Sequence, residues 1–202
     1  MSSQLSDQDL EQIDTGIRDK YKKVAVTPEG HFKYPTGRIG LKELQYDDQL
    51  LADLPDTVAD SFCGVGNPFS LGEIPSDTHV LDIGCGSGVD AILAAKLAGA
   101  SGKVLGIDLT MEMVQKANSN KKMMNRDNID FQVARVQDLT GMEASFDLVI
   151  SNGVFNLIPE KEVALQAVYR LLKPGGRLFL ADQFVSGALS KDLKDRISSW
   201  FQ

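Results

Sequence analysis

His79-Val-Leu-Asp-Ile-Gly-Cys-Gly-Ser-Gly-Val-Asp90 is the stretch that decides the fold of this chain. Its apolar first half predicts a buried strand over residues 79–84, and glycines at alternate positions then break that strand. The apolar run over residues 88–98 predicts a helix directly after the turn. Strand, glycine turn and helix together form a place where backbone N–H groups can approach a ligand closely.

The same alternation of strands and helices continues toward the C-terminus. Continuous apolar runs predict further strands over residues 103–109, 129–136, 146–151 and 177–181. Helical patterns separate these strands, the clearest over residues 160–173, where the helix stops at Pro174-Gly-Gly176. Alternation of this kind predicts a parallel sheet with helices on both faces. We therefore expect an α/β fold, a Rossmann-like doubly wound and mostly parallel sheet of about five strands.

Composition and charge narrow the function classes. The 202 residues are 43% hydrophobic and 24% charged, which is ordinary for one globular domain. The net charge of −7 argues against nucleic-acid binding, and no apolar run approaches the roughly 20 residues that span a bilayer. The polar N-terminus is unlike a signal peptide, so we expect a cytoplasmic location and no membrane partner. Two cysteines and two histidines far apart predict neither a disulfide framework nor a metal site.

The glycine turn is open to two interpretations. It can belong to a nicotinamide or flavin site, or to a site for another nucleoside-containing ligand. A nicotinamide or flavin fingerprint needs its last glycine three positions after the second, whereas here Gly84, Gly86 and Gly88 alternate. Asp82 stands two positions before the first glycine, and Asp108 ends the second predicted strand about 20 residues downstream. A carboxylate at that place in such folds accepts hydrogen bonds from ribose hydroxyls. The spacing therefore favours a nucleoside-containing ligand and disfavours a nicotinamide oxidoreductase.

At these residues the sequence resembles the class I S-adenosylmethionine-dependent methyltransferases. Leu81-Asp-Ile-Gly-Cys-Gly-Ser-Gly88 is similar to their first motif, and Gly106-Ile-Asp108 is similar to their ribose-binding segment. Leu172-Lys-Pro-Gly-Gly176 is similar to the turn before their fifth strand. The resemblance covers roughly residues 60–185 and implies a methyltransferase enzyme with S-adenosyl-L-methionine as cofactor and S-adenosyl-L-homocysteine as product.

The resemblance also implies a cofactor site and a domain plan. Asp82 is expected near the ammonium group of the methionine moiety, and Asp108 is expected to accept both ribose hydroxyls. The full set implied to bind the cofactor is Asp82, Gly84, Cys85, Gly86, Gly88, Asp108, Leu109, Met113, Val136 and Asn152. No residue is assigned a catalytic role, because the sulfonium carries the driving force and the protein mainly aligns donor and acceptor. We expect a single methyltransferase domain over residues 1–202, with 1–75 as an N-terminal helical cap and 76–202 as the cofactor-binding core.

Within that family the chain is most similar to the arsenite methyltransferases. Two segments are similar to the sequence pattern of that group, namely Gly64-Val-Gly-Asn-Pro68 and Ile150-Ser-Asn-Gly-Val-Phe-Asn-Leu157. Those enzymes hold trivalent arsenic on cysteine thiolates, but this chain has Val65 and Gly153 where their pattern has cysteine. Arsenite is therefore a disfavoured acceptor, and we expect another small molecule. Tyr34, Gly153 and Asn156 are the candidate substrate residues.

The C-terminal end leads to two further hypotheses. The resemblance implies seven strands, and the sequence shows five, so the C-terminal hairpin of the family is expected to be missing. A helical stretch over residues 190–200 ends in Trp200-Phe201, and an exposed apolar end of this kind predicts a homodimer through the C-terminal end. The missing strands and cysteines also leave open a cofactor-binding module of the same fold without turnover.

Overall fold

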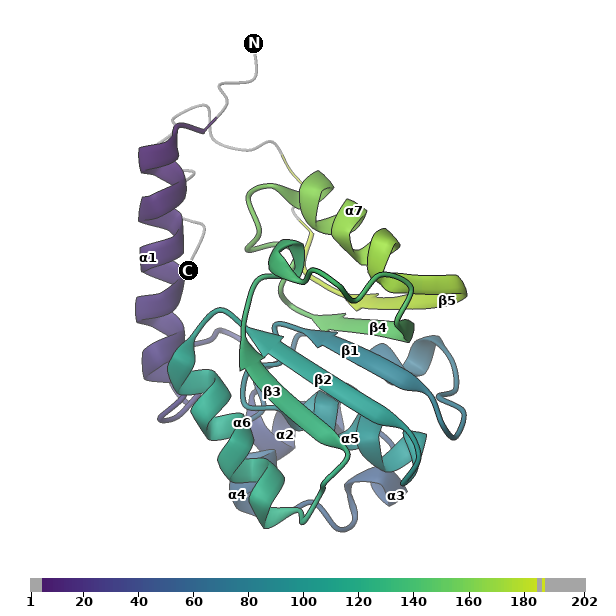
Figure 1. Ribbon diagram of the computed structural model, residues 1–202. Helices are drawn as coiled ribbons and strands as arrows, with labels where there is room; N and C mark the ends of the chain where they lie inside the picture. The colour runs from purple at the N-terminus through teal and green to yellow at the C-terminus, as the bar shows by residue number, and fades with distance from the viewer. Residues whose placement is uncertain (1–4, 185–186, 188–202) are drawn as a thin grey trace.

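The computed structural model describes residues 5–184 and residue 187 (Figure 1). Five strands form one sheet in the order β3-β2-β1-β4-β5, and all neighbouring strands are parallel. The strands are β1 (His79–Ile83), β2 (Lys103–Asp108), β3 (Ile129–Val133), β4 (Phe146–Asn152) and β5 (Leu172–Ala181). The expected α/β fold, a Rossmann-like doubly wound sheet, is confirmed.

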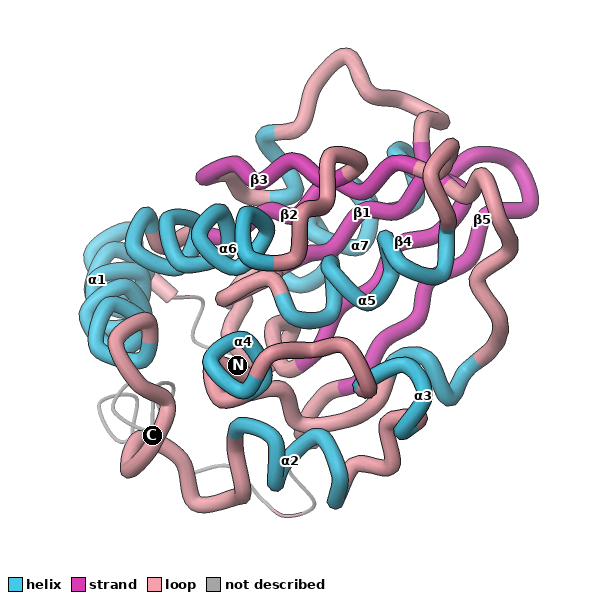
Figure 2. Tube along the Cα trace, turned by 90° about the horizontal axis from the view of Figure 1, so that it is seen from below, coloured by secondary structure: helices cyan, strands magenta, loops and turns pink. Residues whose placement is uncertain are grey.

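Helices fill the connections between the strands and the whole N-terminal part. They are α1 (Asp7–Val24), α2 (Gly37–Glu43), α3 (Asp48–Leu51), α4 (Asp56–Ala59), η1 (Pro68–Leu71), α5 (Val89–Ala98), α6 (Met111–Met123), η2 (Val136–Asp138) and α7 (Lys161–Leu171). Helix α5 and the short helices α2 to α4 lie on one side of the sheet, and α7 lies on the other (Figures 1 and 2). Each face of the sheet therefore has its own hydrophobic core.

Two of the expected strands have bounds that differ by more than one residue from those in the structure. The strand expected over residues 129–136 ends at Val133, because the chain turns there into the short helix η2. Strand β5 begins at Leu172, earlier than expected, and its register against β4 shifts between the pairs Phe146–Leu172 and Leu148–Arg177. The residues skipped by this shift include the Pro174-Gly-Gly176 turn, which the sequence placed before the strand.

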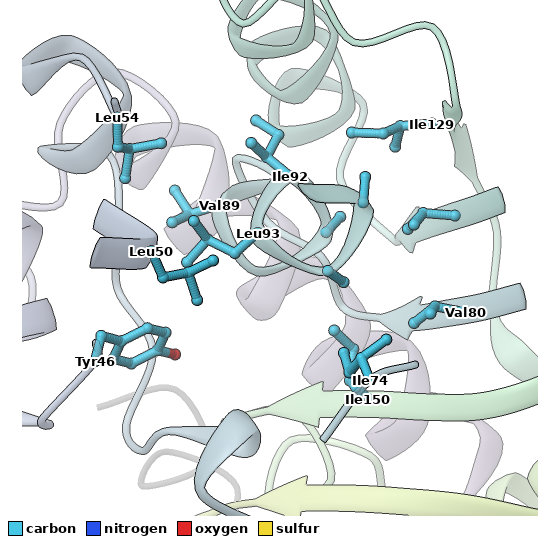
Figure 3. Close-up of a cluster of buried hydrophobic side chains, with 14 of the residues drawn as sticks. Tyr46, Leu50, Leu54, Ile74, Val80, Val89, Ile92, Leu93, Ile129 and Ile150 are labelled. Atoms are coloured by element: carbon cyan, nitrogen blue, oxygen red, sulfur yellow. The ribbon is translucent and has the colours of Figure 1, made fainter. Parts of the chain in front are cut away.

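Helix α5 is buried over most of its surface. Eight of its ten residues are buried, and Leu97 is its one exposed residue. Its side chains Val89, Ile92 and Leu93 lie between the sheet and the N-terminal segment that carries Leu50 and Leu54 (Figure 3). Burying each such side chain stabilises the fold by about 1.5–3 kcal/mol. The N-terminal segment is thereby fixed against the sheet layer that carries the glycine turn.

The register of the sheet brings polar side chains to one edge. Side chains alternate between faces along a strand, so Asp82 shares the face of Val80, and Asn152 shares the face of Ile150. Asp108 ends β2, which is the strand next to β1 on the other side. The carboxyl ends of these adjacent strands therefore place Asp82, Asp108 and Asn152 at the edge where open α/β sheets bind ligands.

Helix α1 crosses this edge. Ser6 and Asp9 form a capping box at its start, which satisfies backbone N–H groups that would otherwise lack partners. Its buried residues Ile13 and Ile17 pack with Leu157, which follows β4. Helix α1 is thus packed against the segment that follows β4, and the division into a cap over residues 1–75 and a core over 76–202 stays a prediction.

Some expectations concern residues outside the described ranges. The helical stretch expected over residues 190–200, and with it the C-terminal dimer interface, lies outside the described residues. Of the helices that the structure does describe, none is both long and apolar enough to cross a membrane.

Candidate active site

A cavity of about 490 Å³ opens at the carboxyl edge of the sheet. Its walls come from the ends of β1, β2 and β4, from the turn after β3, and from helix α1. The predicted site residues that line it are Asp82, Gly84, Cys85, Gly86, Asp108, Leu109, Val136, Asn152 and Gly153. The structure therefore brings most of the predicted site into one cavity.

The requirement for glycine differs among the three positions of the turn. All have positive φ, at 67°, 52° and 82° for Gly84, Gly86 and Gly88. A Cβ at Gly84 would lie 2.2 Å from Val154, and one at Gly88 would lie 2.7 Å from Phe131. A Cβ at Gly86 would meet nothing within 4 Å. Packing thus requires two of the glycines, whereas Gly86 leaves its backbone open toward the cavity.

Asp108 fixes the glycine turn and still faces the cavity. Its Oδ2 accepts a hydrogen bond of 2.9 Å from the Gly86 N–H, and its Oδ1 accepts one of 2.8 Å from the Thr110 N–H. Burial raises the pKa of this carboxyl above its ordinary value, although these backbone bonds lower it. Each carboxylate oxygen can accept more than one hydrogen bond, so both oxygens can still accept a hydrogen bond from a ligand.

Asp82 is the most deeply buried acid of the cavity wall. Its side chain is 2% exposed, and its Oδ2 accepts no hydrogen bond from any described residue. Burial raises its pKa well above the usual range, and the charges of Asp90 and Asp108 raise it further. A buried acceptor without a partner is costly unless a ligand group or water supplies the hydrogen.

Asn152 lines the cavity, but its side-chain amide forms hydrogen bonds with neighbouring groups of the protein. Its Oδ1 accepts hydrogen bonds from the N–H groups of Val65 and Gly66, and its Nδ2 donates to the Gly66 carbonyl and to Asp90. The side chain therefore ties the loop before η1 to the end of β4. Its direct contact with a cofactor stays a prediction.

Four predicted site residues do not line the cavity. Met113 is fully buried in α6, and Gly88 packs against Phe131 beneath the turn. The Tyr34 hydroxyl donates to the Cys63 carbonyl, and the Asn156 N–H donates to Asp182. A direct role in binding stays a prediction for all four residues.

The structure also adds residues that the sequence analysis missed. Helix α1 contributes Leu10, Ile13, Ile17 and Tyr21 to the cavity wall, and none of the four was among the predicted site residues. Asp90, in the first turn of α5, lines the cavity as well. One signal could have found it, because Asp90 is the lone acid in a helix whose other residues are almost all apolar.

Polar contacts hold α1 over the cavity. Arg18 donates from Nη1 to the Leu109 carbonyl at 2.6 Å and from Nε to Asp14 at 2.9 Å. Arg135, beside η2, donates to the other oxygen of Asp14 at 2.5 Å. Arg18 therefore links the helix to the wall at Leu109, and Asp14 links it to the wall at Arg135.

Replacing Arg18 with alanine is expected to loosen α1. The change removes the bond to the Leu109 carbonyl, a loss of about 1 kcal/mol for a partly exposed contact, so amide exchange in α1 should accelerate about fivefold. Hydrogen-exchange mass spectrometry measures this, with exposed Lys23→Ala in the same helix as the control. Equal exchange in Arg18→Ala and wild type would show that the contact does not hold the helix.

Comparison with known proteins identifies the family. A family model described as a methyltransferase domain matches residues 74–202, which include the whole sheet and the glycine turn. The chain belongs to the methyltransferase-domain family.

Several curated methyltransferases are similar to the chain. An arsenite methyltransferase of Halobacterium salinarum is 31% identical over 204 residues, which cover 94% of this chain and 52% of that protein. A demethylmenaquinone methyltransferase of Lactiplantibacillus plantarum is 34% identical over 138 residues, or 61% of this chain and 58% of that protein. The chain thus spans about half the length of these curated relatives.

Solved structures agree with the fold of this methyltransferase domain. An arsenic(III) S-adenosylmethionine methyltransferase of Chlamydomonas reinhardtii is 36% identical with a TM-score of 0.61, covering 74% of this chain and 50% of that one. A SAM-dependent methyltransferase of Aquifex aeolicus is 21% identical with a TM-score of 0.54, covering 78% of this chain and 79% of that one. The second likeness supports the fold alone.

Proposed function

We propose that this chain is an S-adenosylmethionine-dependent methyltransferase that acts on a small molecule. The main support for the proposal is the hydrogen bond from the Gly86 N–H to the Asp108 carboxylate. This bond places the glycine turn beside a carboxylate that can accept hydrogen bonds from a ribose, and both line one cavity. Family membership and the similarity to named methyltransferases support the same activity.

The residues present fit S-adenosyl-L-methionine. The carboxylate of Asp108 offers acceptors for the ribose hydroxyls, and the turn at Gly86 leaves room for a ligand beside its backbone. Leu109 and Val136 both line the cavity and supply apolar surface for the adenine. The partnerless oxygen of Asp82 offers an acceptor for the ammonium group of the methionine moiety.

The protein's own part in the reaction is alignment and exclusion of water. When bound, the cofactor supplies an activated methyl group on its sulfonium, which a nucleophile can displace in line. The cavity is lined by the apolar side chains of Ile13, Ile17 and Ile158, which disfavour the binding of water there. Holding donor and acceptor in such a site supplies proximity and orientation, which general estimates put at up to about 7–11 kcal/mol. No acid–base pair is required for this chemistry.

A small molecule other than arsenite is the acceptor we propose. Positions 65 and 153 are adjacent, since a Cβ at Gly153 would lie 3.2 Å from the Val65 methyl groups, and neither position carries a thiol. Cys63 and Cys85 do line the cavity, but burial raises the pKa of Cys63 to about 12 and that of Cys85 well above its usual value, which disfavours their thiolate forms. Metals and metalloids bind the thiolate form. The net charge of −7 disfavours nucleic acid.

A binding module without turnover is the alternative, favoured by the absence of thiols at Val65 and Gly153. Incubation with methyl-labelled S-adenosylmethionine and a panel of thiols, quinols, small amines and arsenite separates the two. We expect label on at least one of the first three classes and little on arsenite. If every acceptor stays unlabelled while the cofactor binds, the module is the correct description.

A homodimer and a cytoplasmic location complete the proposal. Strand β5 pairs only with β4 among the described strands, so it lies at an edge of the sheet that a second copy can cover. Both cysteines are free thiols, which is usual in a reducing compartment. Light scattering at micromolar concentration is expected to give twice the chain mass, and a mass of one chain would contradict the dimer.

A further inference from the structure

The cavity extends further along the sheet edge than the residues proposed to hold the cofactor's nucleoside and ammonium groups. Those residues, Asp82, Asp108 and Val136, lie at the ends of β1 and β2 and in the turn after β3. The strand order places the end of β4 on the other side of β1. The residues after β4 that line the cavity are Gly153, Val154, Leu157, Ile158, Pro159 and Glu160. The part of the cavity beside this segment is therefore available for a second molecule, the methyl acceptor.

The walls of this part are largely apolar. Ile13 and Ile17 of α1 pack with Leu157 in a hydrophobic cluster that is separate from the two cores on the sheet faces. We name the space between α1 and residues 153–160 the acceptor chamber. The apolar side chains that line it are Leu10, Ile13, Ile17, Val154, Leu157 and Ile158. An apolar molecule that enters the chamber releases water from these side chains, which favours its binding.

The charges around the cavity disfavour an anionic acceptor. Within the described part of the chain, the only basic residue that lines the cavity is Arg135, and its Nη2 donates to Asp14 Oδ1 at 2.5 Å. Lys161 follows the chamber segment, but its Nζ donates to the Ile158 carbonyl at 2.7 Å. The acids that line the cavity are Glu11, Asp14, Asp82, Asp90, Asp108 and Glu160. A carboxylate or phosphate in the chamber would lose its water without gaining a cationic partner.

We propose that the acceptor chamber binds a methyl acceptor that has an apolar body and carries no carboxylate or phosphate group. This inference rests on the proposed function, because it takes the rest of the cavity to hold S-adenosylmethionine. In the transfer, the acceptor's nucleophilic atom bonds to the methyl carbon while the bond from that carbon to the sulfonium breaks. The electron pair of the broken bond passes to the cofactor sulfur, and the proton of the nucleophile is released to water.

Three thiols with the same reacting group measure this preference. The chain loaded with S-adenosylhomocysteine is titrated calorimetrically with 1-butanethiol, 1-hexanethiol and 6-mercaptohexanoate, so that binding is observed without turnover. Each buried methylene group strengthens binding roughly 3- to 4-fold, so 1-hexanethiol is expected to bind about 10-fold more tightly than 1-butanethiol. We expect 6-mercaptohexanoate to bind at least about 10-fold more weakly than 1-hexanethiol, because its carboxylate finds no cationic partner.

A substitution in the chamber and a matched control place the binding there. Leu157→Asn replaces an apolar lining side chain with a polar one of similar size, so we expect about 5- to 10-fold weaker binding of 1-hexanethiol. The affinity for S-adenosylhomocysteine should change less than about twofold, which also reports that the variant is folded. Leu165→Asn makes the same change at an exposed position of α7 outside the cavity wall, and it should leave both affinities unchanged.

The outcomes distinguish this inference from the proposed function. Suppose that wild type binds S-adenosylhomocysteine but binds no thiol, binds all three equally, or prefers 6-mercaptohexanoate. The apolar acceptor is then wrong, and the assignment of the cofactor stands. Unchanged binding of 1-hexanethiol by Leu157→Asn would likewise overturn the chamber. If wild type does not bind S-adenosylhomocysteine, the proposed function fails and the inference falls with it. Affinity that rises with chain length and drops only in Leu157→Asn supports the inference.

Discussion

Replacing Asp108 with alanine is expected to weaken the binding of S-adenosylhomocysteine by about 100-fold or more. The carboxylate is placed to accept hydrogen bonds from two ribose hydroxyls, and a hydrogen bond to a charged group contributes about 1.5–3 kcal/mol. The same oxygens hold the N–H groups of Gly86 and Thr110, so the variant also releases the turn that faces the ligand. Both effects act in the same direction.

Controls separate the ribose contact from these backbone contacts. Asp108→Asn keeps an oxygen that can accept one of the two backbone N–H groups but loses the charge, so its affinity should lie between wild type and Asp108→Ala. Asp130→Ala removes an exposed acid from the neighbouring strand β3 and should bind as wild type. Equal affinity of Asp108→Ala and wild type would show that the ribose does not lie at this carboxylate.

Replacing Gly84 with alanine is expected to lower the free energy of unfolding by about 2–5 kcal/mol. A φ of +67° costs an L-residue about 1–2 kcal/mol, and the new methyl group would lie 2.2 Å from a Val154 methyl, an overlap that adds about 1–3 kcal/mol. Gly86→Ala is expected to lower the free energy of unfolding by only about 1–2 kcal/mol, the conformational cost of a positive φ, because nothing lies within 4 Å of its new Cβ. Urea denaturation followed by circular dichroism measures both.

A double variant isolates the steric part of this effect. Val154→Ala removes the two methyl groups that the new Cβ would meet, so Gly84→Ala/Val154→Ala should be more stable than the sum of the single changes predicts. Gly86→Ala should show the reverse profile, with a small loss of stability and a larger loss of ligand affinity. If Gly84→Ala is as stable as Gly86→Ala, close packing does not explain the first glycine.

Much of the sheet could be predicted from local patterns. The strand that ends at Ile83, the glycine turn and the acid at Asp108 follow from apolar runs and from glycine spacing, which are short-range signals. Parallel strands end at one edge of a sheet, so the ends of β1 and β2 bring Asp82 and Asp108 to the same edge. The structure places both at the cavity.

The rest of the site depends on contacts between distant parts of the chain. Nothing local in α1 distinguishes a helix that lines a cavity from one that packs on the surface, because both need an apolar stripe. The family resemblance implied Met113 as a cofactor-binding residue; the structure buries it fully in α6, and its contact with a cofactor stays a prediction. The pairing of Tyr46 with Asp90 joins residues 44 positions apart, and only the fold brings them together.

Calorimetric titration of the wild-type chain with S-adenosylhomocysteine, and separately with NADH, tests most directly whether the cavity is an S-adenosylmethionine site. The alternating glycines and the bond from Gly86 to Asp108 predict one S-adenosylhomocysteine bound per chain and no binding of NADH. Absence of binding by S-adenosylhomocysteine, or tight binding of NADH in its place, would contradict the assignment of the cavity.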